Sequence, residues 1–242
     1  MELTIRAADV RRTLYAAIVA MTAASAVGAA IELCGGPGLG SLGRILSVDA
    51  ESSIPNWYSA LALAVAAGLL AVIATEARRR RDRDALAWVS LCAIFALLSL
   101  DEIAAVHETA GARLGELVHA GGWFTFAWVI PALVLVPAVG ATFLPFLSRL
   151  ATRRRRQFVT AGAIFVTGAL VMEMIGGKAL SRFPKTTFYS PDQMMISPAY
   201  AVCFHIEEFC EMMGIAMFIA ALVEHLAELP GSSGLTVRVR ND

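Results

Sequence analysis

The chain has 242 residues, of which 57% are hydrophobic and only 17% are charged, whereas a soluble domain carries about 25% charged residues. Lys and Arg together number 20, as do Asp and Glu, so the formal net charge is zero. This value says nothing about partners, because the charges are sorted by topology; no nucleic-acid partner is expected. With a mean hydropathy of +0.66 and charges gathered between long apolar runs, the composition excludes a large soluble domain. It predicts an all-α bundle of membrane helices.

Six apolar runs predict six transmembrane helices in a single helical domain, residues 1–242. Each run is long enough to cross a hydrocarbon core of about 30 Å at 1.5 Å per residue. The predicted spans are residues 12–34, 57–76, 85–108, 123–147, 158–177 and 198–226.

Basic residues alternate between the loops, which predicts the orientation of the spans. The first set of loops carries Arg6, Arg11, Arg12, Arg78, Arg79, Arg80, Arg81, Arg83, Arg149, Arg153, Arg154, Arg155, Arg156, Arg238 and Arg240. The loops between them hold only Arg44, Arg113, Lys178, Arg182 and Lys185. The positive-inside rule assigns the first set to the cytoplasm. Both termini are then cytoplasmic, which requires an even number of spans.

Acidic residues and histidines recur inside three of the spans, whose interiors hold no Lys or Arg. At 1.5 Å per residue, Asp101 lies about 24 Å from the cytoplasmic end of its helix and Glu173 lies about 22 Å from that end. His205 to Glu211 lie about 10–20 Å below the outer end of the last span. We therefore expect all three helices to bring these side chains to one depth, in the outer half of the bilayer.

The angular positions rank these residues as ligands of a buried site. Asp101 and Glu108 are seven residues apart and lie about 20° from each other on one helix face, whereas His107 points well away from that face. The predicted metal ligands are Asp101, Glu108, Glu173, His205, Glu208 and Glu211, with Glu102, His107 and Glu207 in a second group. No catalytic residue is assigned.

These acidic side chains would place negative charge inside the bilayer, and the protein has to compensate that charge. An ionised carboxylate at the bilayer centre costs at least about 2.5–3.5 kcal/mol, so protons, a water-filled cavity or bound cations are needed. Carboxylates combined with imidazole suit iron, manganese or zinc, and helix bundles build metal sites from inward-facing Glu and His. We therefore expect one of these metals as the cofactor, although the sequence holds only the reverse of the usual Glu-x-x-His order, at His205–Glu208.

Three motifs carry a resemblance to known proteins: SSIPNWYS at 52–59, LSLDE at 98–102 followed by His107 and Glu108, and EEFCEMMG at 207–214. Together they resemble a set that recurs in polytopic bacterial membrane proteins of unassigned function. The resemblance implies a multi-pass protein of the bacterial inner (plasma) membrane and supports the grouping of the acids. It implies no reaction.

Three functions remain open from the sequence. The first is a metal-dependent membrane enzyme, an oxidoreductase or hydrolase acting on a lipid-soluble or periplasmic small molecule. The second is a cation- or proton-coupled transporter, which the almost wholly apolar inner halves of the spans disfavour. The third is a non-catalytic subunit or assembly factor of an oligomer or a larger membrane complex. The lipid bilayer is a partner in each case.

Overall fold

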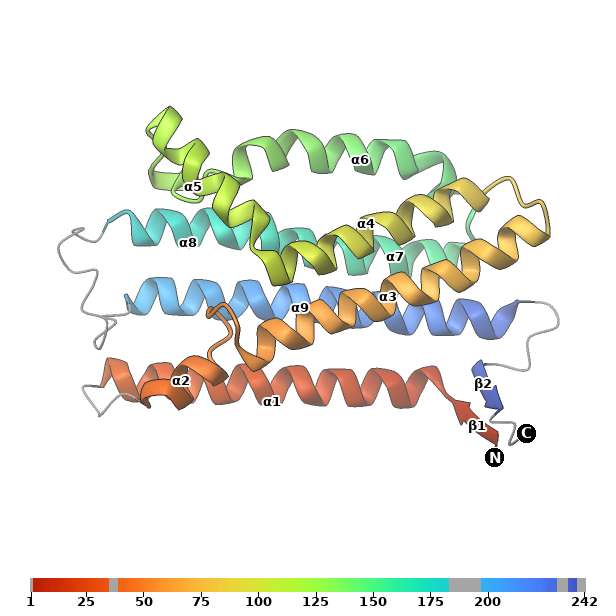
Figure 1. Ribbon diagram of the computed structural model, residues 1–242, viewed down its shortest axis with the longest axis horizontal. Helices are drawn as coiled ribbons and strands as arrows, with labels where there is room; N and C mark the ends of the chain where they lie inside the picture. The colour runs from red at the N-terminus through yellow and green to blue at the C-terminus, as the bar shows by residue number, and fades with distance from the viewer. Residues whose placement is uncertain (1, 35–38, 183–196, 230–234, 239–242) are drawn as a thin grey trace.

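The structure, a computed structural model, describes residues 2–34, 39–182, 197–229 and 235–238, and it is a bundle of long helices (Figure 1). A short antiparallel ribbon pairs β1 (Glu2–Ile5) with β2 (Leu235–Arg238). The helices are α1 (Ala7–Leu33), α2 (Gly40–Leu46), α3 (Ile54–Arg79), α4 (Ala85–Ala104), α5 (Val106–Val118), η1 (Gly122–Phe124), α6 (Val129–Arg149), α7 (Thr152–Val166), η2 (Thr167–Met172), α8 (Glu173–Leu180) and α9 (Pro198–Glu228).

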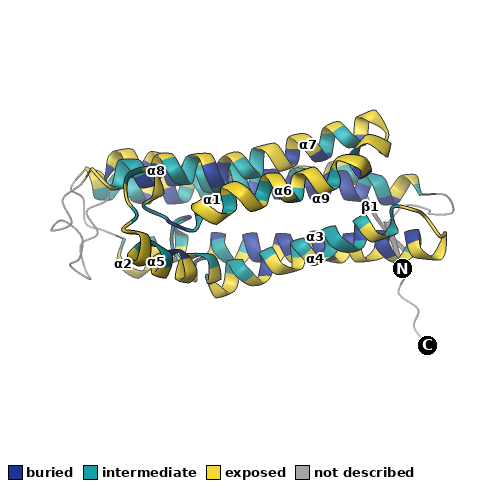
Figure 2. Cartoon of the chain, turned by 90° about the horizontal axis from the view of Figure 1, so that it is seen from above, coloured by how far each residue is buried: buried dark blue, intermediate teal, exposed yellow. Residues whose placement is uncertain are grey.

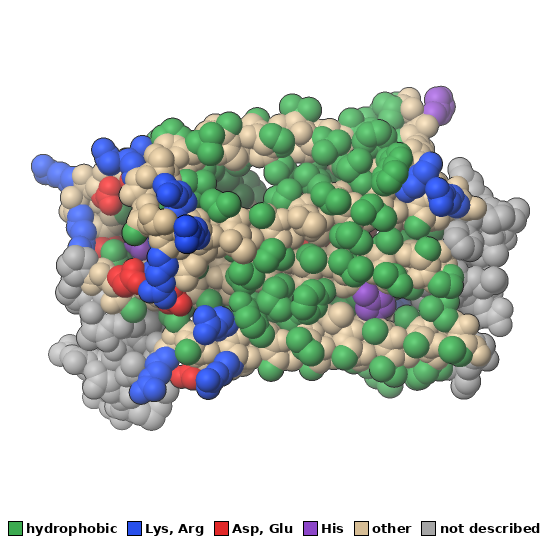
Figure 3. Space-filling view, turned by 180° about the vertical axis from the view of Figure 1, so that it is seen from behind, with side chains coloured by type: hydrophobic (Ala, Val, Ile, Leu, Met, Phe, Trp, Pro, Cys, Tyr) green, Lys and Arg blue, Asp and Glu red, His purple; other side chains and the backbone are tan. Residues whose placement is uncertain are grey.

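Five helices in the described part of the chain are long and apolar enough to cross a membrane. They are α1, α3, α4, α6 and the continuous helix Thr152–Leu180 that α7, η2 and α8 form. Their outward faces carry large apolar side chains, such as Leu97 (65% exposed) and Val134 (74% exposed). Apolar side chains cover the middle of the molecule, and Lys and Arg gather mainly at one end (Figure 3). Such surfaces suit lipid, so the predicted all-α membrane architecture is confirmed.

Helix α9 lies at the centre of the bundle. It packs against α1, α3, α7, η2 and α8, and its C-terminal half is almost continuously buried, from Met212 to Leu226 (Figure 2). It is not one of the five helices above, although it occupies the predicted sixth span. Because α9 touches most of the long helices, it determines how their inward faces meet.

Two glycines allow the helix Thr152–Leu180 to approach α9 closely. A Cβ atom at Gly168 would lie 2.7 Å from the carbonyl oxygen of Glu207, and one at Gly214 would lie 2.8 Å from the carbonyl oxygen of Ala161. Both distances are far below van der Waals contact. The two backbones therefore touch at these positions, as small residues allow in membrane bundles.

The predicted helix 85–108 is wrong at its C-terminal end. Helix α4 stops at Ala104, and Ala105 adopts a left-handed conformation (φ 45°, ψ 43°) before α5 begins. A non-glycine residue in this region costs of order 1–2 kcal/mol, so tertiary contacts have to hold the break. Asp101 and Glu108 consequently lie on two different helices, and the 20° angle expected between them does not apply.

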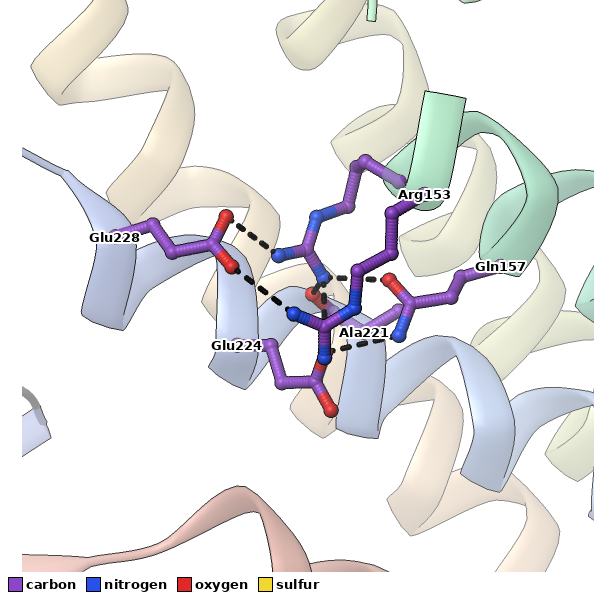
Figure 4. Close-up of polar contacts among 6 residues, drawn as sticks. Arg153, Gln157, Ala221, Glu224 and Glu228 are labelled. Carbon is purple, nitrogen blue, oxygen red and sulfur yellow. Dashed lines mark hydrogen bonds and ion pairs between the residues drawn. The ribbon is translucent and has the colours of Figure 1, made fainter. Parts of the chain in front are cut away.

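The end of the bundle that holds the termini also holds the α3–α4 and α6–α7 turns (Figure 1). Here Arg154 of α7 is buried, with 4% of its surface exposed. Its guanidinium donates to the carbonyl oxygen of Ala221 at 2.5 Å, to Gln157 at 2.9 Å and to Glu228 at 2.8 Å (Figure 4). The neighbouring Arg153 is 69% exposed and donates to Glu224 at 2.8 Å. These contacts attach the start of α7 to the end of α9.

Candidate functional site

An acid-lined cavity of about 570 Å³ opens at the other end of the bundle, among α3, α4, α5, α6, α7, η2, α8, α9 and the loops before α3 and α6. Among the described residues that line it there is no Lys or Arg. Its acids are Asp49, Glu51, Asp101, Glu102, Glu108, Glu173, Glu207, Glu208 and Glu211. The name acid-lined cavity is used below for this space.

The break after α4 brings His107 onto Asp101. One carboxylate oxygen of Asp101 accepts the backbone N–H of His107 at 2.9 Å, and the other lies 2.5 Å from Nδ1 of the His107 ring. The first contact caps the start of α5 in the way that an aspartate caps a helix N-terminus. The His107 ring packs edge-on against Trp128, with 4.9 Å between ring centroids. The Asp101 carboxylate thus holds both the break and the orientation of the imidazole.

The motif at 52–59 fixes the start of α3 and the end of α4. Ser53 caps α3 by accepting the backbone N–H of Asn56 at 3.1 Å, and Pro55 occupies the first turn, where its missing N–H does no harm. The Asn56 side chain donates to the carbonyl oxygen of Glu102 at 3.0 Å and lies 3.4 Å from the Glu102 carboxylate. Asn56 therefore positions Glu102 at the wall of the acid-lined cavity.

Two further acids are held by aromatic donors. The indole Nε1–H of Trp128 donates to Glu173 at 2.8 Å, and the hydroxyl of Tyr200 donates to Asp49 at 3.1 Å. A Cβ atom at Gly111 would lie 2.9 Å from Trp128, so this glycine lets α5 reach the tryptophan. Each of these two aromatic side chains therefore lines the acid-lined cavity and also positions one of its acids.

Helix α9 supplies Glu207, Glu208 and Glu211. All three line the acid-lined cavity together with Glu173 of α8. Beside them the Thr152–Leu180 helix widens into a π-helical turn, η2, whose Ala169 and Leu170 line the cavity. Such turns are frequent at functional sites because they change the direction of the side chains that follow. Here the turn directly precedes Glu173.

The structure brings together most of the predicted ligands, and it separates one from them. The predicted residues that line the acid-lined cavity are Asp101, Glu102, His107, Glu108, Glu173, Glu207, Glu208 and Glu211. His205 does not line it. Its Nε2 lies 3.0 Å from the hydroxyl of Ser25 and its Nδ1 lies 2.7 Å from the carbonyl oxygen of Ala201, so it faces α1.

Sequence reasoning missed Asp49 and Glu51. Both lie in the loop before α3 that connects to the SSIPNWYS motif, and both line the acid-lined cavity. The signal in the sequence is their position: they are the only acids between residues 33 and 75. The loop acids extend the site from the membrane helices to the surface of the protein.

Burial and neighbouring acids change the protonation of these two loop residues. Burial raises the pKa of Asp49 from 3.8 to about 7; the hydrogen bond from Tyr200 opposes this rise, and Glu173, Glu108 and Glu51 add to it. Burial also raises the pKa of Glu51, and repulsion from Glu108 adds to that rise. Asp49 therefore titrates near neutral pH.

We expect Asp49→Asn to stabilise the protein at pH 8 and to change its stability little near pH 4. Between pH 4 and 7 the folded state keeps a proton on Asp49 that the unfolded state has lost, so this contribution to stability disappears as the pH rises through the raised pKa. Asparagine cannot lose that proton. Thermal midpoints of both proteins in detergent from pH 4 to 8.5 test this, with the exposed Asp9→Asn as control. A difference that stays constant with pH would contradict it.

The acid-lined cavity does not present a preformed metal site. In the described part of the chain, no group of three or more His, Cys, Asp or Glu side chains is arranged to hold a metal ion. The donor types suit iron, manganese or zinc, but their arrangement does not fit, because the carboxylates are spread around a large cavity. Chemically, the cavity offers hydrogen-bond acceptors and negative charge over an extended surface.

Comparisons with known proteins bear on the extent of the site. Over residues 13–226 the chain matches a family described as "Domain of unknown function (DUF8692)". No curated protein and no solved structure matches it. The matched range contains every residue that lines the acid-lined cavity.

Proposed function

Because the chain belongs to the DUF8692 family, which brings no activity with it, we propose its function from the cavity: it is a membrane protein that binds a cation. The observation that carries this proposal is nine acids around one cavity, with no Lys or Arg among the described lining residues. Ionised carboxylates in a membrane protein require compensation. A bound cation supplies it without the loss of any carboxylate.

We also propose the orientation of the chain. Helix α9 is the sixth span, and both termini lie on the cytoplasmic side of a bacterial inner membrane. The basic end of the bundle holds the termini (Figures 1 and 3), which supports this under the positive-inside rule. The acid-lined cavity then opens toward the non-cytoplasmic side.

The size and walls of the acid-lined cavity favour an organic cation over a single metal ion. About 570 Å³ lies in the range of small-molecule sites, and one ion fills only a small part of it. Trp128, Phe126 and Tyr200 line the cavity beside the acids, and aromatic faces attract ammonium groups. Iron, manganese or zinc is the second candidate, and it requires carboxylates to move together.

Binding is favoured over transport through the membrane. Beyond Glu211 the lining turns apolar, with Phe165, Val166 and Leu63 closing the inner side of the cavity. No polar route to the cytoplasmic end continues from there among the described residues. An enzyme is the second candidate function, since His107 is held by Asp101 through Nδ1 and can exchange a proton through Nε2.

We expect the double variant Glu208→Gln/Glu211→Gln to bind cations at least about tenfold more weakly than the wild type. It should also unfold at a higher temperature, because mutual repulsion in the empty cavity is relieved, as is common where function requires strain. The exposed Glu116→Gln, on α5 and outside the cavity lining, is the matched control.

The measurements are metal content by mass spectrometry of protein never exposed to chelator, and titration with tetramethylammonium followed by tryptophan fluorescence. A stoichiometric metal that the double variant loses would make the protein a metalloprotein. Tetramethylammonium binding that the double variant loses would support the organic cation. If the wild type binds neither, the proposed function is wrong.

A further inference from the structure

A second, wholly apolar pocket of about 240 Å³ lies directly beneath the acid-lined cavity. Residues of α3, α4, α6, α7 and α9 form it, and no charged side chain contributes to it. The lining residues are Leu63, Leu91, Phe95, Leu98, Phe143, Phe146, Leu147, Phe158, Ala161, Gly162, Phe165, Val166, Gly214, Ile215 and Phe218. The name apolar pocket is used below for this space.

The two spaces share part of their walls. Four residues line both: Leu63, Leu98, Phe165 and Val166. The order along each helix agrees with this. On α4, Phe95 lines the apolar pocket, Leu98 lines both, and Glu102 lines the acid-lined cavity. The spaces therefore follow one another along the bundle.

Helix α9 gives the same order and a length. Glu207 and Glu211 line the acid-lined cavity, and Gly214 and Phe218 line the apolar pocket. At 1.5 Å per residue, Glu207 and Phe218 are about 16 Å apart along the axis. The combined space is therefore elongated, with acids at one end and only hydrocarbon walls at the other.

The apolar pocket can be reached from the lipid. Gly162 lines it and is itself exposed, and no neighbouring atom lies within 4 Å of where its Cβ would be. The backbone of α6 makes few close approaches to the other described helices, although its Phe146 is buried against Trp88 of α4. The surface is hollowed beside α6, the uppermost helix (Figure 3). A ligand can therefore enter sideways from the bilayer.

We propose that the acid-lined cavity and the apolar pocket together bind one cationic amphiphile with a single alkyl chain, its head among the acids and its chain in the apolar pocket. This rests on the proposed function, whose cation it identifies by class. Charge complementarity selects the head, since the described lining offers carboxylates and no base. An alkyl chain gains little on leaving a bilayer that is equally apolar. The bilayer instead concentrates the amphiphile beside the apolar pocket, and the pocket lets the alkyl chain stay in apolar surroundings while the head reaches the acids.

The test uses the full chain in lipid nanodiscs and two probes that share a head group. Tetramethylammonium carries the head alone, and dodecyltrimethylammonium carries the head and one chain. Dissociation constants come from tryptophan fluorescence, and native mass spectrometry counts bound probe, with empty nanodiscs as background. For the wild-type protein, we expect the dodecyl chain to lower the dissociation constant about tenfold or more relative to tetramethylammonium.

Two variants fill the space that the alkyl chain of the ligand would occupy in the apolar pocket. Gly162→Phe places a ring at the mouth of the apolar pocket, and Leu91→Trp fills the pocket from its α4 wall, at a residue that does not line the acid-lined cavity. Both should bind tetramethylammonium as the wild type does and lose the advantage of the chain. Gly140→Phe, at an exposed glycine of α6 outside both linings, should keep it.

The outcomes separate the two proposals. If tetramethylammonium binds but the chain gives no advantage, or if both pocket variants keep the advantage, the amphiphile is wrong and cation binding stands. If no cation binds, metal ions included, the proposed function fails first. One bound dodecyltrimethylammonium per protein, with the advantage lost in both pocket variants, supports the combined site.

Discussion

Gly168→Ala should destabilise the protein by about 3 kcal/mol, at the upper end of what an overpacked interior costs. The new methyl group would lie 2.7 Å from the carbonyl oxygen of Glu207 and 2.9 Å from the side chain of Glu211. Neither neighbour can move away without a cost in free energy. The Glu207 carbonyl is part of the α9 backbone, and the Glu211 side chain is attached to the same helix. Helix α9 therefore has to move away, which also displaces two acids of the cavity.

Gly162→Ala is the matched control for this substitution. Gly162 lies on the same continuous helix, but its added methyl group would meet no atom within 4 Å. Alanine should be neutral there or stabilise the helix by up to about 1 kcal/mol. Unfolding by sodium dodecyl sulfate, followed by circular dichroism, measures both. Equal stability of the two variants would show that the helices are not in backbone contact at Gly168.

Arg154→Ala should destabilise the protein by about 3 kcal/mol, the lower end for breaking a buried charged contact. The substitution removes the donors to Ala221, Gln157 and Glu228 and leaves a space where the side chain was buried. Glu224 keeps Arg153 as a partner, which keeps the loss from being larger. The same unfolding measurement applies.

Arg153→Ala is the internal comparison, because Arg153 precedes Arg154 directly and contacts Glu224 and Glu228 from the surface. Its side chain is 69% exposed, and exposed ion pairs contribute at most about 1 kcal/mol. Each variant removes one positive charge from the first turn of α7, so any effect on membrane orientation is shared. Similar destabilisation by the two variants would contradict the buried role of Arg154.

The long helices could be predicted because hydropathy reports them directly. The break at Ala105 could not, since the surrounding residues include no Gly or Pro, and alanine is the best helix former. The break depends on two contacts: the Asp101 carboxylate accepts the N–H of His107, six residues away, and the Asn56 side chain donates to the Glu102 carbonyl, 46 residues away. Helix propensity, read residue by residue along the sequence, reports neither contact.

The depth of each acid along its helix could be predicted from the sequence, and this part of the candidate site was predictable. Acids on three helices were expected at one level, and Asp101, Glu173 and Glu208 do line one cavity. Depth does not decide which way each helix is rotated: His205, predicted as a ligand, turns toward Ser25 of α1, a partner 180 residues away. Asp49 lines the acid-lined cavity from a loop. The path of this loop depends on how the helices pack and not on a periodic pattern in the sequence.

The central position of α9 has a consequence for biosynthesis. The ribosome makes it after every other long helix described, yet α1, α3 and α7 all pack against it. Those earlier helices enter the bilayer before their common partner exists. The cavity acids made before α9, among them Asp101 and Glu102 of α4 and Glu173 of α8, must therefore wait in a loose assembly. Final packing can occur only when translation has passed residue 228, so a pause in synthesis before α9 would expose these acids to quality-control proteases.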